Sequence, residues 1–118
     1  MDQVPYSLDA PRRAAVLTAI QGVCSYRNWS LLAAHVRSTH VHVVVRAEDK
    51  PEKVMNDFKS YASRELNNTG LDQKDRRRWA RHGSTRWLHA NKEVDAAIHY
   101  VLHEQGEPMA VFERPYNL

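Results

Sequence analysis

The clearest strand in this sequence is HVHVVVR, residues 40–46. Side chains alternate between the two faces of a strand, so one face here carries only valines and the other carries two histidines and a valine. The valine face comprises Val41, Val43 and Val45, and the histidine face comprises His40, His42 and Val44. We expect the wholly apolar face to lie in the protein core, which leaves the histidine face for chemistry.

The neighbouring residues extend this strand into a pattern of helices and strands. Residues 29–37 form a second strand, and Ser38-Thr39 connects the two tightly as in a β-hairpin. Helices are expected over residues 11–26, 51–67 and 91–105, further strands over residues 3–8 and 109–113, and short extended pieces over residues 79–82 and 85–89. Pro11 and Pro51 suit the first turn of a helix, and Asn91 is expected to cap the third helix. This order predicts an α+β fold, a ferredoxin-like antiparallel sheet with helices packed on it.

Composition narrows the class of protein. The chain has 118 residues, of which 42% are hydrophobic and 26% charged, and this length suits a single domain over residues 1–118 with its own core. The single cysteine, Cys24, excludes a disulfide framework and a cysteine-based zinc site. No apolar run approaches the roughly 20 residues of a membrane helix, and residues 1–8 carry no signal-peptide pattern. These features predict a soluble, cytoplasmic protein that does not bind membranes.

Positive charge is concentrated in residues 74–86. The net charge of the chain is only +3, which is a weak indication of a polyanionic partner. The segment itself is rich in arginine and has tryptophans within and beside it, and this combination suits single-stranded nucleic acid, because guanidinium groups bind phosphates and indole rings stack on bases. The alternative is a solvated loop whose tryptophans, Trp79 and Trp87, face inward. The candidate DNA-binding residues are Arg76, Arg77, Arg78, Trp79, Arg81 and Arg86.

The two histidines of the strand are candidate metal ligands. Residues two apart on a strand lie about 7 Å apart on the same face, so His40 and His42 can both reach one metal ion. An H-x-H triplet is also a common coincidence on a solvated strand face. Both interpretations stay open on the strand alone.

The helix expected over residues 91–105 carries a tyrosine and a carboxylate on one flank. At about 100° per residue, Glu104 lies one turn after Tyr100 at the edge of the apolar stripe, where both side chains can meet the histidine strand. Gln105 projects about 140° away from Tyr100. The alternative is that Tyr100 is a half-buried aromatic residue with its hydroxyl in water.

Together these residues resemble the HUH nucleases with a single catalytic tyrosine. More narrowly, the chain is similar to the small single-tyrosine transposases of insertion sequences, including the REP-associated tyrosine transposases of bacteria. The resemblance begins with His40-Val41-His42 and the later helix that carries YVLHEQ, residues 100–105. It extends over AAHVRSTHVHVVV, VMNDFKSYASRELN, RRRWARHGSTRWL and YVLHEQGEPMAVFE.

The resemblance implies a ferredoxin-like domain that cuts and rejoins single-stranded DNA at a hairpin-marked site. It implies that His40 and His42 are ligands of Mg²⁺ or Mn²⁺ and that Tyr100 is the nucleophile, which forms a 5′-phosphotyrosine. The family places its third ligand four residues after the tyrosine, often as Gln or Asn. Here that position holds Glu104, which helical geometry favours over Gln105.

Two other functions stay open. A domesticated relative would bind a DNA hairpin without cutting it, and a different metal-dependent phosphodiesterase would use the H-x-H pair without covalent attack. Retention of His40, His42 and Tyr100 together favours the transposase, because a pure binder has no need of all three. The chain can act as a monomer or a homodimer, and the short link from Trp87 to Asn91 favours an active site made within one chain.

Overall fold

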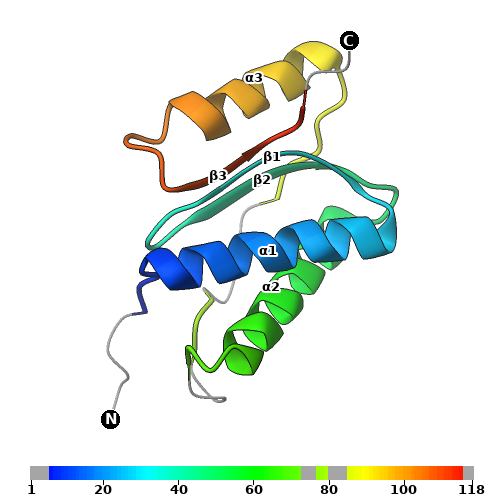
Figure 1. The fold of residues 1–118 in the computed structure, drawn as a ribbon. Helices are drawn as coiled ribbons and strands as arrows, with labels where there is room; N and C mark the ends of the chain where they lie inside the picture. Colours follow the sequence, from blue (N-terminus) through cyan, green and yellow to red (C-terminus); the bar gives the residue numbers. More distant parts are fainter. Residues whose placement is uncertain (1–5, 73–76, 80–84, 116–118) are drawn as a thin grey trace.

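The computed structural model describes residues 6–72, 77–79 and 85–115. The elements in these ranges are α1 (Ala10–Arg27), β1 (Ser30–Val36), β2 (Val41–Arg46), α2 (Pro51–Asn68), α3 (Asn91–His103) and β3 (Ala110–Glu113). The strands form an antiparallel sheet in the order β2-β1-β3, and α1 and α2 lie on one side of it while α3 lies on the other (Figure 1). The α+β class predicted from the sequence is therefore confirmed.

The β-hairpin is the centre of the fold. β1 pairs with β2 on one side and β3 on the other, and its residues Ala33–Val36 are completely shielded from solvent. The hairpin register places His35 opposite His42, and the register shifts between Leu31 and Ala33. A shift of this kind lets a strand bend and twist more strongly. The central strand β1 is therefore hydrogen-bonded to a strand on each side, and its two faces are buried under the helices.

Two apolar clusters fill the two faces of the sheet. The larger one is built by α1 and α2, whose Val16, Ile20 and Leu66 are almost fully buried, and the predicted core valines of β2 pack against it. The smaller one joins Val44 of β2 to Val101 and its neighbours in α3. The valine face therefore meets α1 and α2, and the histidine face meets α3.

The helix ends follow from local sequence. α1 starts after Asp9, whose side chain accepts a hydrogen bond from the Arg12 N–H, and ends at Asn28 in the left-handed conformation with φ of 64°. Asparagine tolerates that conformation better than most residues, which suits it to a helix C-terminus. α2 begins with Pro51, as predicted.

Several predicted boundaries were wrong. The strand predicted over residues 3–8 lies partly outside the described residues, and Tyr6–Leu8 is not a strand, although Leu8 N–H donates to Ser38 O. The extended pieces over 79–82 and 85–89 are not strands where they are described. Ala90, not Asn91, occupies the N-cap position of α3. That helix ends at His103 rather than residue 105, and β3 begins one residue later than predicted.

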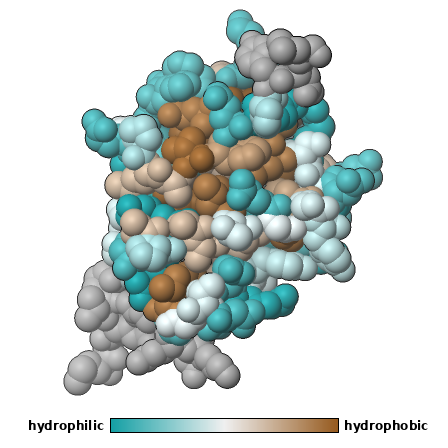
Figure 2. Space-filling model, viewed as in Figure 1, coloured by the Kyte–Doolittle hydropathy of each residue, from teal (hydrophilic) through white to brown (hydrophobic). Residues whose placement is uncertain are grey.

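The surface seen in Figure 2 has hydrophobic residues gathered between α3 and α1, with hydrophilic residues around them. None of the helices in the described ranges combines the length and the apolar character that a membrane span needs.

Candidate active site

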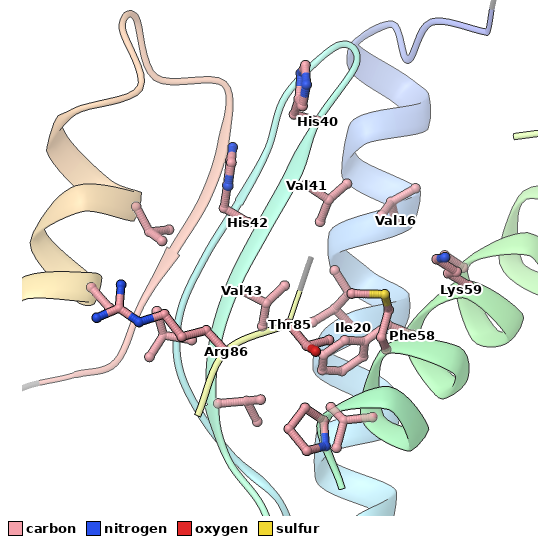
Figure 3. Close-up of a pocket in the computed structure, with 18 of the residues that line it drawn as sticks. Val16, Ile20, His40, Val41, His42, Val43, Phe58, Lys59, Thr85 and Arg86 are labelled. Carbon is pink, nitrogen blue, oxygen red and sulfur yellow. The ribbon is translucent and has the colours of Figure 1, made fainter. Parts of the chain in front are cut away.

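The hairpin brings the two predicted metal-binding histidines side by side. His42 lies in β2 and His40 lies just before it, and their rings are stacked with centroids 6.2 Å apart and planes only 8° apart. Figure 3 shows His42 on one side of β2 and the valines Val41 and Val43 on the other. The two rings lie on the same face because every second side chain of an extended chain returns to that face.

Tyr100 of α3 lies against this histidine pair. The centroid of its ring is 6.2 Å from that of His42, and the two rings meet edge to face at 89°. The Tyr100 side chain remains accessible to solvent, because the residue is 50% exposed. One chain therefore brings the predicted nucleophile next to a predicted metal ligand.

The surroundings of His42 favour its neutral form. Burial of the ring is the largest cause that lowers its pKa, and the nearby His40, His35 and Arg37 lower it further. A neutral imidazole is the form that binds metal ions. The environment of His42 thus suits a ligand role.

Glu104, the predicted third ligand, points elsewhere in this structure. It is the residue that caps the C-terminus of α3, and its Oε2 lies 3.1 Å from Nδ1 of His99. Gln105 donates weakly to the Tyr100 carbonyl at 3.5 Å. Within the described part of the chain, no three His, Cys, Asp or Glu side chains are gathered as a metal site. The two imidazoles lie side by side, whereas the Glu104 carboxylate is paired with His99.

An open groove of about 830 Å³ extends from the histidine pair along β2 to α2. It passes around the free edge of β2, because β2 is a terminal strand of the sheet and residues from both of its faces line the groove. Figure 3 shows its walls: Val43 on the strand, Phe58 and Lys59 on α2, and Arg86 from the segment that precedes α3. The groove therefore combines an apolar floor with cations at its edge, next to Tyr100, which also lines it.

The predicted DNA-binding segment contains residues of two different kinds. The Arg78 side chain is only 3% exposed; its Nε donates to Asp72 at 3.0 Å and its Nη2 donates to Asn67 at 2.6 Å. Trp79 donates its indole N–H to Ser63 Oγ at 2.7 Å and packs against the larger cluster. These two side chains hold the segment against α2, so in this conformation neither is presented to DNA.

The remaining basic residues face solvent where they are described. Arg86 is 77% exposed at its side chain and lies 3.9 Å from Glu93 of α3. Trp87 is 56% exposed, and Arg77 is also exposed. Arg76 and Arg81 lie outside the described residues. The candidate contact surface for nucleic acid therefore lies at Arg86 and Trp87, beside α3.

Asp72 is the acidic centre that anchors Arg78. It also accepts hydrogen bonds from the Tyr6 hydroxyl and from Arg12 Nε, the latter at 2.9 Å. Burial alone would raise the pKa of Asp72, but the hydrogen bonds from its partners outweigh it and lower the pKa to about 2. Burial, together with the bond to Asp72, raises the pKa of Tyr6 to about 12. This network fastens the start of α1, the end of α2 and the basic segment to one another.

The sequence-based analysis missed His35. It is completely buried in β1, between the strand that carries His42 and the helix that carries Tyr100. Its position in the otherwise apolar run LLAAHV, residues 31–36, is the signal that was available, because a polar side chain in a fully covered strand requires partners.

Comparison with known families gives one match. A family model described as "Transposase IS200 like" matches residues 7–103. The match includes the histidine strand and Tyr100, and it ends one residue before Glu104. No curated protein and no solved structure matches the chain.

Proposed function

Because the chain belongs to the family of IS200-like transposases, we propose that it cuts and rejoins single-stranded DNA through a covalent link to Tyr100. The observation that carries the proposal is the contact between the Tyr100 and His42 rings within one chain. A phenol half open to solvent can approach a phosphodiester, and a histidine pair beside it can hold the ion that such a reaction uses.

The proposed step is a transesterification at phosphorus. The Tyr100 hydroxyl loses its proton and its oxygen attacks phosphorus, the P–O3′ bond breaks, and the leaving oxygen takes up a proton as a free 3′-hydroxyl. The product is a 5′-phosphotyrosine, which conserves the bond energy for the reverse attack by a 3′-hydroxyl during rejoining. Neither oxidant nor nucleotide cofactor is required.

His40 and His42 are the residues that would hold Mg²⁺ or Mn²⁺, with Glu104 as the third ligand once it leaves His99. When bound, such an ion would withdraw charge from the non-bridging phosphate oxygens. Imidazole and carboxylate donors suit Mn²⁺ as well as Mg²⁺. The lowered pKa of His42 supports this assignment, because the ring is then neutral at physiological pH.

The exposed residues before α3 are the proposed DNA contacts. Arg86 would bind phosphate and Trp87 is available to stack on a base, since both side chains are open and lie near the Tyr100 helix. Arg76, Arg77 and Arg81 belong to the same basic segment and are proposed to extend this contact. Arg78 and Trp79 would instead support the segment from beneath. The substrate is proposed to be single-stranded DNA that carries a hairpin.

The test is the covalent adduct. Purified protein is incubated with a labelled single strand that carries a hairpin and with Mn²⁺, and products are separated under denaturing conditions. We expect the wild type to form a protein–DNA adduct and Tyr100→Phe to form none, because no phenol oxygen remains. Stability should change by about 1 kcal/mol or less, since the ring keeps its contacts.

Each result separates the candidate functions. An adduct formed by Tyr100→Phe would mean that another residue attacks. Cleavage without an adduct by both proteins would indicate a phosphodiesterase that uses the histidines without covalent catalysis. Hairpin binding without cleavage by the wild type would indicate a DNA-binding protein that no longer cuts.

A further inference from the structure

His35 is a buried side chain that the proposed reaction does not use directly. It lies on the central strand, is 0% exposed, and its Cα is paired with that of His42 across the hairpin. Residues directly opposite on neighbouring antiparallel strands project to the same face. His35 therefore faces α3, on the side of the sheet that carries the candidate active site.

Both ring nitrogens of His35 have backbone partners. Nδ1 lies 3.1 Å from the Val101 carbonyl oxygen, and a carbonyl only accepts, so Nδ1 must carry the hydrogen. The Met109 N–H donates to Nε2 at 3.0 Å, so Nε2 must present its lone pair. Arg37 Nη1 lies 3.4 Å from the same Nε2 and is also a donor. The surroundings thus fix one tautomer of a neutral ring.

The two backbone groups that bond to His35 lie before and after the C-terminal end of α3. Val101 is in the last turn of α3, where carbonyl groups have no partner within the helix. Met109 directly precedes β3. His35 therefore satisfies an otherwise unpaired helix carbonyl and ties the connection after the helix to the centre of the sheet.

Tyr100 directly precedes Val101, the residue that His35 holds. The same histidine is paired with His42, whose ring contacts Tyr100. One buried side chain thus connects the backbone next to the predicted nucleophile to β1, which pairs with the strand that carries His42. Displacement of a reacting group by about 1 Å can cost about 100-fold in rate, so such a connection matters for transesterification.

We propose that His35 is a positioning residue, which sets the height and rotation of the last turn of α3 so that Tyr100 stands over the histidine strand. The inference rests on the proposed function, since it assigns a role within the reaction assigned to Tyr100. His35 itself does not touch the substrate.

Two conservative variants separate the two bonds. In His35→Asn the amide nitrogen lies near the place of Nδ1 and can still donate to Val101 O. In His35→Gln the longer side chain brings its amide oxygen near the place of Nε2 and can still accept from Met109 N–H. Because the bond to α3 is the one that fixes Tyr100, we expect His35→Asn to preserve the reaction better than His35→Gln.

The measurement is the single-turnover rate of adduct formation at saturating DNA, together with hairpin affinity. We expect His35→Gln to lower the rate about 100-fold and His35→Asn to lower it less than about 10-fold, with affinity within about twofold in both. Val23→Ala is the matched control, because Val23 is 0% exposed in the cluster on the opposite face. It should lower stability without slowing the folded protein.

A second readout does not depend on activity. The wild type and Val23→Ala should show nuclear Overhauser contacts between the rings of Tyr100 and His42, and His35→Gln should lose them. If the wild type forms no adduct, the proposed function fails, while these contacts still decide whether His35 positions the helix. Equal rates and unchanged ring contacts in His35→Asn, His35→Gln and Val23→Ala would overturn the inference.

Discussion

The two faces of the sheet differ in what they bury. The face covered by α1 and α2 holds the larger cluster, in which Ile20, Val23 and Leu66 are at most 1% exposed. The face covered by α3 holds a smaller cluster, and Tyr100 stands half-exposed at its edge beside His42. The larger core and the proposed catalytic residues therefore lie on opposite faces of the same three strands, so substitutions on the two faces should have separable effects.

Loss of a histidine tests the chemical face and has the largest expected effect. We expect His42→Ala, and likewise His40→Ala, to lower the rate of adduct formation roughly 100-fold or more in Mn²⁺, because a proposed metal ligand is removed. Hairpin affinity should stay close to that of the wild type, since neither histidine lies in the basic segment. Gel assays of cleavage and binding on the same strand measure both quantities. If either variant cleaved DNA at the wild-type rate, the assignment of His40 and His42 as metal ligands would be wrong.

The opposite face is tested by Leu66→Ala. Leu66 in α2 is 0% exposed, and truncation of a buried leucine costs about 2–5 kcal/mol through lost burial and the cavity left behind. Urea denaturation should show this loss, while the adduct rate of the folded fraction should remain unchanged. A slowed reaction in fully folded Leu66→Ala protein would show that the two faces are coupled.

Acid should weaken the anchor at Asp72. Its pKa is lowered to about 2 in the folded protein, so its contribution to stability is complete at pH values above its ordinary pKa and is lost as the pH falls toward 2. The expected loss in the free energy of unfolding is about 2 kcal/mol. Urea denaturation at a series of pH values measures it, and Asp72→Asn should have a flatter profile over that range. An unchanged profile in the variant would assign the acid sensitivity to other carboxylates.

The smallest effect is expected for the exposed Arg86 of the basic segment, which can be compared with the buried Arg78. Arg86→Ala should weaken DNA binding and reduce its salt dependence by about one unit of slope, as expected for one lost phosphate contact. Arg78→Ala should instead lower stability, because it leaves the nearly buried carboxylate of Asp72 without a main partner. Salt titrations of binding and urea denaturation distinguish the two. If Arg86→Ala and Arg78→Ala were equally stable and weakened DNA binding equally, the distinction between an exposed DNA-binding arginine and a buried structural arginine would be wrong.

The alternation of the histidine strand was predictable because a period of two depends only on local sequence. The α+β class followed from the order of elements in the same way. The position of Glu104 was not predictable from helical phase, because α3 ends at His103 and the next residue has non-helical φ and ψ of −119° and 22°. The Glu104 side chain therefore does not continue the helical face of Tyr100, and its carboxylate contacts His99 instead.

The roles of Arg78 and His35 required the tertiary structure. In the sequence, Arg78 is one of several adjacent arginines, and nothing local distinguishes the one that meets Asp72 and Asn67. His35 finds its partners Val101 and Met109 only after the hairpin, α3 and β3 have come together. Arg78 and His35 each bond to residues that are distant in the sequence or belong to another element. Only the folded structure shows that these two side chains are buried rather than on the surface.

The two ends of α3 are joined to the rest of the chain by links of unequal length. Only residues 104–109 separate its C-terminus from β3, whereas residues 69–90 separate its N-terminus from α2. Tyr100 lies near the short link. A DNA strand bound covalently there would pull on the end of the helix that is tied to the sheet. Tension in that strand would therefore be borne by the hydrogen-bonded pairing of β3 with β1, and a tethered 5′ end would keep its position until the 3′-hydroxyl returns.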